Sequence, residues 1–289
     1  MGTAGYSWVG ITYTCPRPCV QKKEKSHCYP LCLTRNPGFW GLVNNAGISA
    51  FGETGWLSME KYEKNADVNL LGSIRTILAF LSLLRKYKGC IVFMSSIIAY
   101  FSLGNDIYSM TKAAIEKFCD ALRLEMKKFG VWIFQRTPAR SPSLLQNSAL
   151  FCLPCVLVFR IQVCIIQPGN YARSTKIQPP DSAEEIWIEL RDEEKADYNR
   201  EYVQEQANFF NSILGEGSTN GNEFVDAMVD ALMYPAPKAH YMVAKLEERA
   251  LVFVCALLPT VVMDSLFFLC SEQQSWYCLV TQARWFFKL

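Results

Sequence analysis

Tyr108 and Lys112 are two residues whose types and spacing could support acid–base chemistry. They lie four positions apart near the start of a predicted helix, so their side chains share one face. A lysine ammonium beside a phenol favours the phenolate and is expected to lower the phenol pKa from about 10 toward neutral pH. Such a tyrosine can exchange a proton with an alcohol or a carbonyl oxygen. The pair alone also fits an ordinary solvated helix face.

Polar residues at two predicted strand ends extend this constellation. Ser96 follows a buried strand and could bond to the same oxygen as Tyr108, and Asn69 in the preceding helix could hold a water that links Lys112 to solvent. The sequence Asn44-Asn45-Ala46-Gly47 ends a neighbouring strand, where small residues let a flat ligand approach the backbone. Each of these motifs alone also fits a turn or a strand end. Their order and spacing along the chain make the combined pattern specific.

The elements that must position these residues alternate along the chain. Continuous apolar runs predict buried strands at 39–43, 90–94 and 163–166, and helical periodicity predicts helices at 58–87 and 107–129. Strands of this kind, separated by helices, favour an α/β fold with a parallel sheet that is covered on both faces. Ligands bind at the carboxyl ends of such strands, where the candidate residues fall.

Composition excludes several classes of protein. The chain has 289 residues, of which 51% are hydrophobic, and 29 Lys and Arg oppose 27 Asp and Glu. This is too apolar for a disordered protein and not basic enough for electrostatic nucleic-acid binding. Two His exclude a His-rich metal site, and we expect no metal. The 12 Cys are below the density of a disulfide scaffold, which favours free thiols.

The C-terminal half predicts a small helical lobe. Ser182 to Glu185 reads as a capping box that opens a polar helical stretch to about residue 214, and another helix is expected at 222–233. The apolar stretch 251–270 is long enough to span a membrane, but Pro259 and Asp264 argue against a plain span. Membrane-surface contact, a buried core or subunit interface, and a true span all stay open.

The ordered motifs resemble the signature of the short-chain dehydrogenase/reductase family. That resemblance implies a partial Rossmann-like, doubly wound parallel sheet and an NAD-dependent oxidoreductase that interconverts a secondary alcohol and a ketone. It assigns catalytic roles to Asn69, Ser96, Tyr108 and Lys112. It assigns cofactor binding to Asn44, Ala46, Gly47, Tyr108, Lys112, Pro168 and Gly169. NADP is not excluded.

Within the family, the chain is most similar to the branch that acts on 3-hydroxybutyrate, retinol and hydroxysteroids. Stretches 39–55, 67–76, 168–171 and 217–232 favour the pair 3-hydroxybutyrate and acetoacetate, with retinol or a hydroxysteroid as alternatives. The resemblance implies a homo-oligomer that is mitochondrial and membrane-associated, or bound to the endoplasmic reticulum, with phospholipid contact through 251–270. Spacings of twelve and thirteen residues between serine and tyrosine both occur in this branch, and we favour Ser96 over Ser95.

Three stretches depart from the family pattern and leave 38–269 as the dehydrogenase domain. Residues 1–37 lack the Gly-rich T-G-x3-G-x-G turn, and their cysteines at 15, 19, 28 and 32 leave a zinc site or a poorly ordered arm open. Residues 133–162 read as an insertion, for which we hypothesise a retained intron or a shifted exon boundary. The aromatic tail 270–289 has no family counterpart.

Two further expectations concern activity and substrate. Without the Gly-rich turn, the chain could be a family remnant that binds no dinucleotide, and this stands as the alternative to an active enzyme. The candidates for substrate contact are Gln167, Asn170 and Trp187.

Overall fold

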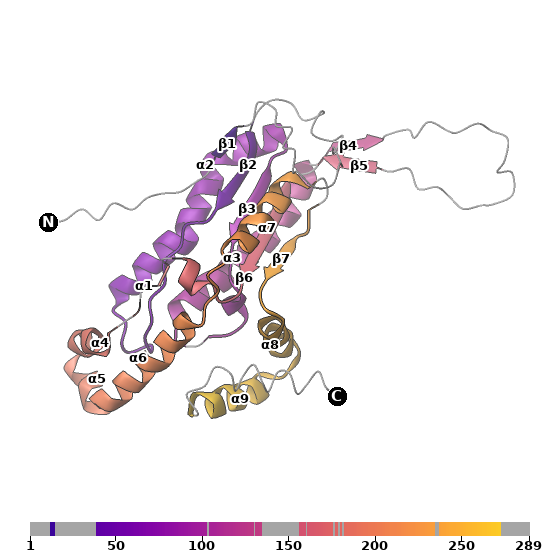
Figure 1. Ribbon diagram of the computed structural model, residues 1–289. Helices are drawn as coiled ribbons and strands as arrows, with labels where there is room; N and C mark the ends of the chain where they lie inside the picture. The colour runs from indigo at the N-terminus through magenta and orange to yellow at the C-terminus, as the bar shows by residue number, and fades with distance from the viewer. Residues whose placement is uncertain are drawn as a thin grey trace, which may run out of the picture.

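In the computed structural model, a sheet with four parallel strands forms the centre of the protein (Figure 1). Its strand order is β1-β2-β3-β6-β7, and β1 pairs antiparallel with the outer edge of β2. The strands are β1 (Thr12–Thr14), β2 (Phe39–Asn44), β3 (Cys90–Met94), β6 (Gln162–Pro168) and β7 (His240–Val243). The structure describes residues 12–14, 39–102, 104–129, 131–134, 156–159, 161–175, 177–178, 180, 182–234 and 237–272.

Helices cover both faces of this sheet. The longer ones are α1 (Met59–Ala66), α2 (Gly72–Tyr87), α3 (Asp106–Met126), α6 (Arg200–Gly215), α7 (Asn222–Met233), α8 (Leu246–Leu257) and α9 (Thr260–Glu272). The shorter ones are η2 (Asp67–Leu71), η3 (Ile97–Tyr100), η4 (Lys127–Phe129), η5 (Ala172–Ser174), α4 (Ala183–Glu189) and α5 (Asp192–Asp197). The expected α/β class, with strands separated by helices, is confirmed.

Alternation along the central strands explains why the sheet is apolar on both faces. Ile91 and Phe93 of β3 pack with Ile77 of α2 and Ile115 of α3. The intervening residues of the same strand point the other way, and Val92 packs against α7. A strand buried on both faces needs a continuous apolar run, which is the pattern that predicted it.

The register of the parallel strands aligns their carboxyl ends. Asn44 of β2 lies opposite Phe93 of β3, and Met94 of β3 lies opposite Ile166 of β6. The residues that follow these strands therefore meet at one edge of the sheet. The helices that begin nearest to that edge contribute their first turns to the same region.

The described part of the segment 133–162 lies outside the central sheet up to Phe159, and its last residue, Gln162, is the first residue of β6. The strands β4 (Val131–Phe134) and β5 (Val156–Phe159) pair antiparallel as a separate two-stranded sheet, which Figure 1 shows projecting away from the main body. The hairpin interrupts the path from α3 to β6 without adding a strand between them. That the segment is an insertion stays a prediction, and its Cys152 and Cys155 lie outside the described residues.

Two expectations for the C-terminal half need correction. The stretch 182–214 is three helices, α4 to α6, because the backbone is extended at Leu190 and Tyr198. The capping box predicted at Ser182 is wrong, since that side chain makes no cap hydrogen bond although the helix does begin at Ala183. Because the stretch is divided into three helices, its aromatic side chains pack around Trp56 and form a separate hydrophobic core.

The apolar stretch 251–270 is divided between two helices. α8 ends at Leu257 and α9 begins at Thr260, with Pro259 at the junction. With 12 and 13 residues, neither helix alone reaches the roughly 20 that a membrane span needs. Leu251 and Met263 pack with Phe101 in a small core, so both helices fold against the segment that follows β3. Most of 1–37 and 270–289 lies outside the described residues, and so does the four-cysteine cluster.

A different helical stretch has the length and composition of a membrane span. The continuous run Met59–Tyr87 comprises α1, η2 and α2, and an 18-residue window within it has a mean hydropathy of 1.5. Its Ile77 and Leu84 are buried against the sheet. A helix that packs on a core passes the same test, so the finding is weak evidence for a span.

Candidate active site

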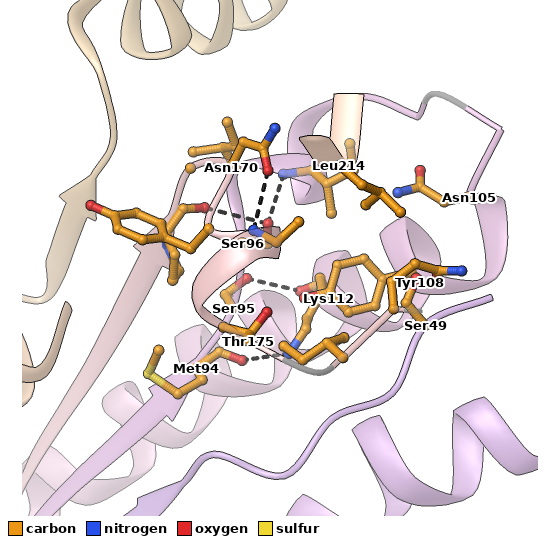
Figure 2. A pocket seen from close by; sticks show the side chains of 18 of the residues that line it. Ser49, Met94, Ser95, Ser96, Asn105, Tyr108, Lys112, Asn170, Thr175 and Leu214 are labelled. Atoms are coloured by element: carbon orange, nitrogen blue, oxygen red, sulfur yellow. Dashed lines mark hydrogen bonds between the residues drawn. The ribbon is translucent and has the colours of Figure 1, made fainter. Parts of the chain in front are cut away.

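A cavity of about 180 Å³ opens at the carboxyl edge of the sheet. Its walls come from the residues after β2, β3 and β6, from the first turns of α3, and from the C-terminal half of α6 (Figure 2). Apolar side chains dominate one side, among them Ile97, Phe101, Phe210 and Leu214. The polar lining residues are Asn45, Ser49, Ser95, Ser96, Asn105, Tyr108, Lys112, Asn170, Tyr171, Thr175, Gln178 and Glu248.

Tyr108 and Lys112 stand together at this cavity, as their spacing predicts. Both line it from consecutive turns of α3, and the Lys112 ammonium lies 5.3 Å from the centroid of the Tyr108 ring. Lys112 is only 3% exposed, and its Nζ donates a hydrogen bond to the Met94 carbonyl oxygen at 2.8 Å (Figure 2). The bond fixes the ammonium between the tyrosine and the end of β3.

The pKa values of the pair differ from the sequence expectation. Burial raises the pKa of Tyr108 above its usual value, and the hydrogen bond from Ser96 lowers it only in part. Burial also lowers the pKa of Lys112 to about 8, against the nearby charge of Glu116, which raises it. The expectation that the Tyr108 pKa is lowered toward neutral pH is therefore wrong, because desolvation outweighs the hydrogen bond from Ser96.

The two serines after β3 point in opposite directions. Ser96 lines the cavity as the residue that bonds to Tyr108, and it also donates to the Pro168 carbonyl at 3.4 Å. The hydroxyl of Ser95 is turned inward instead, because it donates to the buried Glu116 carboxylate at 2.7 Å. Period-two alternation at the strand end separates the two serines, and the geometry favours Ser96 as the partner of Tyr108.

This geometry predicts opposite effects for two alanine substitutions. Ser96→Ala should lower kcat by about tenfold to a hundredfold with an unchanged Tm, because it removes a donor to the reacting oxygen. Ser95→Ala should instead destabilise the fold by about 1–2 kcal/mol, because a bond to a buried carboxylate is lost. Steady-state kinetics and urea unfolding of both variants measure the two effects. The reverse assignment of effects would show that Ser95 is the catalytic serine.

Asn69 anchors the backbone that follows β2. It lies in the π-helical turn η2 and is 2% exposed. Its Oδ1 accepts from the Ile48 N–H at 2.8 Å, and its Nδ2 donates to the Ile48 carbonyl at 2.9 Å and to the Thr111 hydroxyl at 3.0 Å. Both amide hydrogens are thus engaged, and the role of Asn69 in holding a water stays a prediction. A π turn often marks a functional position, and here it aims Asn69 inward.

The residues expected to bind a dinucleotide divide into two groups. Tyr108, Lys112, Pro168 and Gly169 line the cavity, whereas Asn44, Ala46 and Gly47 lie beside it without lining it. A side chain at Gly47 would meet the Lys112 ammonium at 3.5 Å. The buried Nδ2 of Asn44 bonds to no other described residue. This orphaned donor and the open backbone fit a polar ligand edge, as the nicotinamide end of such a cofactor would present.

The described part of the chain contains no group of backbone N–H donors arranged to bind the pyrophosphate of a dinucleotide. A glycine-rich turn between a strand and a helix would supply backbone N–H groups to the phosphates. Before Phe39 the structure describes only Thr12–Thr14, and this strand runs antiparallel to β2. The described residues therefore fit one half of the cofactor.

Glu248 is a cavity residue that the sequence reasoning missed. Its carboxylate accepts from the Asn170 N–H and from the Lys245 N–H, each at 2.8 Å, and is 4% exposed. A Cβ on Gly169 would lie 2.1 Å from Glu248 Oε2, so the carboxylate occupies the space beside that glycine. A glutamate three residues into a helix is a capping signal, and that spacing from Lys245 could have identified it.

Only one of the three expected substrate contacts reaches the cavity. Asn170 lines it, and donates to the Ile213 carbonyl of α6 at 2.6 Å. Gln167 is buried behind the wall, where it bonds to Tyr100 and Glu116. Trp187 packs in the core around Trp56 and is not a lining residue. The assignments of Gln167 and Trp187 were wrong because strand and helix direction, not sequence proximity, decide which side chains face the cavity.

Known proteins place these observations in a family. The sequence matches the family described as short chain dehydrogenase over residues 21–142. D-beta-hydroxybutyrate dehydrogenase, mitochondrial, of Mus musculus is 34% identical over 209 residues, which cover 71% of this chain and 52% of the relative. The chain belongs to the short-chain dehydrogenase family. The residues matched by the family, 21–142, include Ser96, Tyr108 and Lys112.

Other similar proteins come from the same family. Retinol dehydrogenase 7 of Mus musculus is 29% identical, with coverage of 81% of this chain and 65% of the relative. 17-beta-hydroxysteroid dehydrogenase type 6 of Bos taurus is 30% identical, with coverage of 71% and 56%. A solved short-chain dehydrogenase from Streptomyces avermitilis has a TM-score of 0.49 at 17% identity, and covers 81% of this chain and 69% of that one. The chain spans about half the length of the first curated relatives, 52%.

Proposed function

We propose that this chain is an NAD(P)-linked oxidoreductase that interconverts a secondary alcohol and a ketone. The single observation that carries the proposal is the convergence of Ser96, Tyr108 and Lys112 on one cavity at the carboxyl edge of the sheet. Family membership supports it. We take NAD as the cofactor, with NADP as the alternative that a binding measurement would reveal.

The chain's own residues would handle the proton and the orientation of the substrate. Tyr108 exchanges a proton with the substrate oxygen, and the Ser96 hydroxyl donates to that oxygen and holds it in place. Lys112, as an ammonium, stabilises the tyrosinate that takes the proton from the alcohol during oxidation and that forms again when the ketone is reduced. Pro168 and Gly169 would hold the nicotinamide end of the cofactor, which would supply the hydride acceptor or donor. The apolar side of the cavity keeps water from the reacting carbon.

Two substrate classes are supported by different observations. The 34% identity to D-beta-hydroxybutyrate dehydrogenase favours 3-hydroxybutyrate and acetoacetate. The cavity favours a neutral, apolar alcohol of the retinol or hydroxysteroid kind. Among the lining residues that the structure describes, Lys112 is the one cation, and it is committed to Tyr108 and Met94. Glu248 adds a carboxylate to the same wall and would repel a carboxylate substrate.

We give the greater weight to the apolar alcohol, because an unpaired carboxylate is costly to bury. A buried charge without a partner costs several kcal/mol, whereas an apolar ring system would gain from contact with Ile97, Phe101 and Leu214. The hydroxybutyrate reading remains the second candidate, supported by the relative alone. A third candidate is a family remnant without dinucleotide binding, the alternative stated from the sequence.

Membrane contact, self-association and location form a separate proposal. Leu257 and Val261 are 64% and 75% exposed on α8 and α9, which supports contact with a phospholipid surface at the stretch 251–270. Exposed Leu78 and Leu124 on α2 and α3 support a homo-oligomer. The name of the mitochondrial relative supports a mitochondrial location. Sedimentation with phospholipid vesicles, compared with the Leu257→Asp variant, tests the membrane part: equal binding of both proteins would refute it.

One experiment separates the three readings of function. The full chain is titrated with NADH and with NADPH, and tryptophan-to-nicotinamide energy transfer is recorded. It is then assayed with all-trans-retinol, a 17β-hydroxysteroid and 3-hydroxybutyrate. We expect saturable binding at micromolar concentration and kcat/KM at least about a hundredfold higher for the neutral alcohols. Preference for 3-hydroxybutyrate would support the second candidate, and no binding up to millimolar cofactor would support the remnant.

A further inference from the structure

Glu116 is a buried carboxylate that the proposed chemistry does not use. It lies on α3 two turns after Tyr108 and one turn after Lys112, so the three side chains share a helix face. It is 8% exposed, which is unusual for a glutamate and demands hydrogen-bond partners. Its Oε1 accepts from the Ser95 hydroxyl at 2.7 Å and from the Gln167 amide at 2.8 Å.

Each partner of Glu116 adjoins a residue of the site. Ser95 immediately precedes Ser96, and Gln167 immediately precedes the Pro168–Gly169 turn. The Ser95 hydroxyl also lies 3.5 Å from the Lys112 carbonyl oxygen, which closes the link back to α3. One carboxylate oxygen therefore joins the ends of β3 and β6 to the helix that carries the tyrosine and the lysine.

We propose that Glu116 is a positioning residue of this active site, which holds Ser96, Lys112 and the Pro168–Gly169 turn in their mutual arrangement through Ser95 and Gln167. The inference rests on the proposed oxidoreductase function, since it gives that site a support behind the reacting groups. Charged hydrogen bonds of this kind are about twice as strong as neutral ones. A single buried acceptor that is bonded to residues of two strands also fixes how far the end of each strand extends at the sheet edge.

The charge of Glu116 has a second effect on the site. It favours the ammonium form of Lys112 and so opposes the burial that lowers the lysine pKa. Two other titratable side chains lie near the Glu116 carboxylate: Cys119 on α3 and Tyr100 on η3. The negative charge of Glu116 contributes to raising the pKa of each. The side chains that bond to it from β3 and β6 are neutral. Glu116 thus keeps Lys112 protonated over a wider pH range than burial alone would allow.

The test uses Glu116→Gln in the full chain, with Glu125→Gln on the same helix as the matched control. Glutamine keeps an acceptor oxygen for Ser95 and Gln167 but removes the charge, whereas Glu125 is exposed. The pH midpoint of the Lys112 amine is measured by competitive acetylation and mass spectrometry, and kcat is measured across the same pH range. Thermal unfolding of each variant is recorded beside these values.

We expect Glu116→Gln to lower the Lys112 midpoint by about one pH unit and to shift the alkaline limb of kcat down by the same amount. Glu125→Gln should change neither. An unshifted midpoint in Glu116→Gln would overturn the inference. If the unsubstituted chain shows no turnover while the midpoint still shifts, the proposed function fails and the role of Glu116 stands.

A second variant covers the case in which Glu116→Gln does not fold. Glu116→Asp keeps the charge but withdraws the oxygen from Ser95 and Gln167. We expect the Lys112 midpoint to stay and kcat to fall about tenfold, because the misplaced groups lose transition-state contacts. A kcat within twofold of the unsubstituted chain would contradict the positioning role.

Discussion

Tyr108→Phe is expected to lower kcat by about a hundredfold to ten-thousandfold, the range that general acid–base groups contribute. The hydroxyl lies at the cavity with Ser96 as its hydrogen-bond partner, and no other lining residue in the described part of the chain combines a phenol with an adjacent lysine. Phenylalanine keeps the ring that packs over Lys112. The fold should therefore survive, with Tm unchanged or slightly raised because a buried hydroxyl is removed.

Steady-state kinetics with saturating cofactor, together with NADH titration, measure this effect. Binding of the cofactor should stay within about threefold of that of the unsubstituted chain, so the loss lies in the chemical step. Tyr234→Phe is the matched control, because Tyr234 is 48% exposed and lies away from the cavity. Full turnover in Tyr108→Phe would refute the assigned proton transfer.

Lys112→Met is expected to abolish turnover and yet to stabilise the fold. Turnover falls because the ammonium that stabilises the tyrosinate is lost. Stability rises because burial lowers the pKa of Lys112 to about 8, which shows that the folded state disfavours the charged amine. A shift of this size corresponds to about 3 kcal/mol at neutral pH, from which the lost hydrogen bond to Met94 removes about 1 kcal/mol.

The pH dependence of this gain follows from linkage. Below about pH 8 both the folded and the unfolded chain bind the proton, and the folded state bears the full cost of the buried charge. Between about pH 8 and the ordinary lysine value of 10.5, the folded chain releases a proton that the unfolded chain keeps, so the native protein becomes more stable as pH rises. The methionine variant lacks this gain, so its advantage should shrink from about 2 kcal/mol at pH 7, pass through zero at about pH 9.5, and become a disadvantage of about 1 kcal/mol above pH 10.5, where only the lost hydrogen bond to Met94 counts.

Urea unfolding at pH 7, 8, 9 and 10 tests this expectation. Lys117→Met is the control on the same helix, because the Lys117 side chain is 85% exposed and its substitution should change stability by less than about 0.5 kcal/mol. A gain that is constant across the pH range would mean that packing, not desolvation of the ammonium, sets the effect. A loss of stability at pH 7 would contradict the inferred cost of burying Lys112.

Local patterns explain why much of the fold could be predicted from the sequence. Continuous apolar runs mark strands such as Cys90–Met94, and a 3.6-residue period marks α3, because burial on two faces or on one imposes those patterns directly. The Tyr108–Lys112 pair follows from helix geometry alone. The break at Pro259 was a local signal as well, although the sequence reasoning treated the whole apolar stretch as one unit.

What could not be predicted depends on contacts between distant segments. Glu248 meets Asn170 across 78 positions, and nothing near either residue in the sequence announces the other. The alternation at Ser95 and Ser96 was visible, but which of them faces the cavity is decided by Glu116 on α3. The rise in the Tyr108 pKa likewise comes from the packing of the surrounding elements, which no spacing records.

The contact between Gly169 and Glu248 also restricts the order in which this protein can evolve. Any side chain at position 169 would collide with a carboxylate that holds two backbone N–H groups, so a mutation there is deleterious while Glu248 remains. Once a smaller residue stands at position 248, the same mutation meets the Ala244 Cβ at 3.0 Å, a close contact that a small shift can relieve. A substitution at position 248 is therefore expected to precede one at position 169. Homologues should carry a larger residue at 169 only where the glutamate at 248 has been replaced.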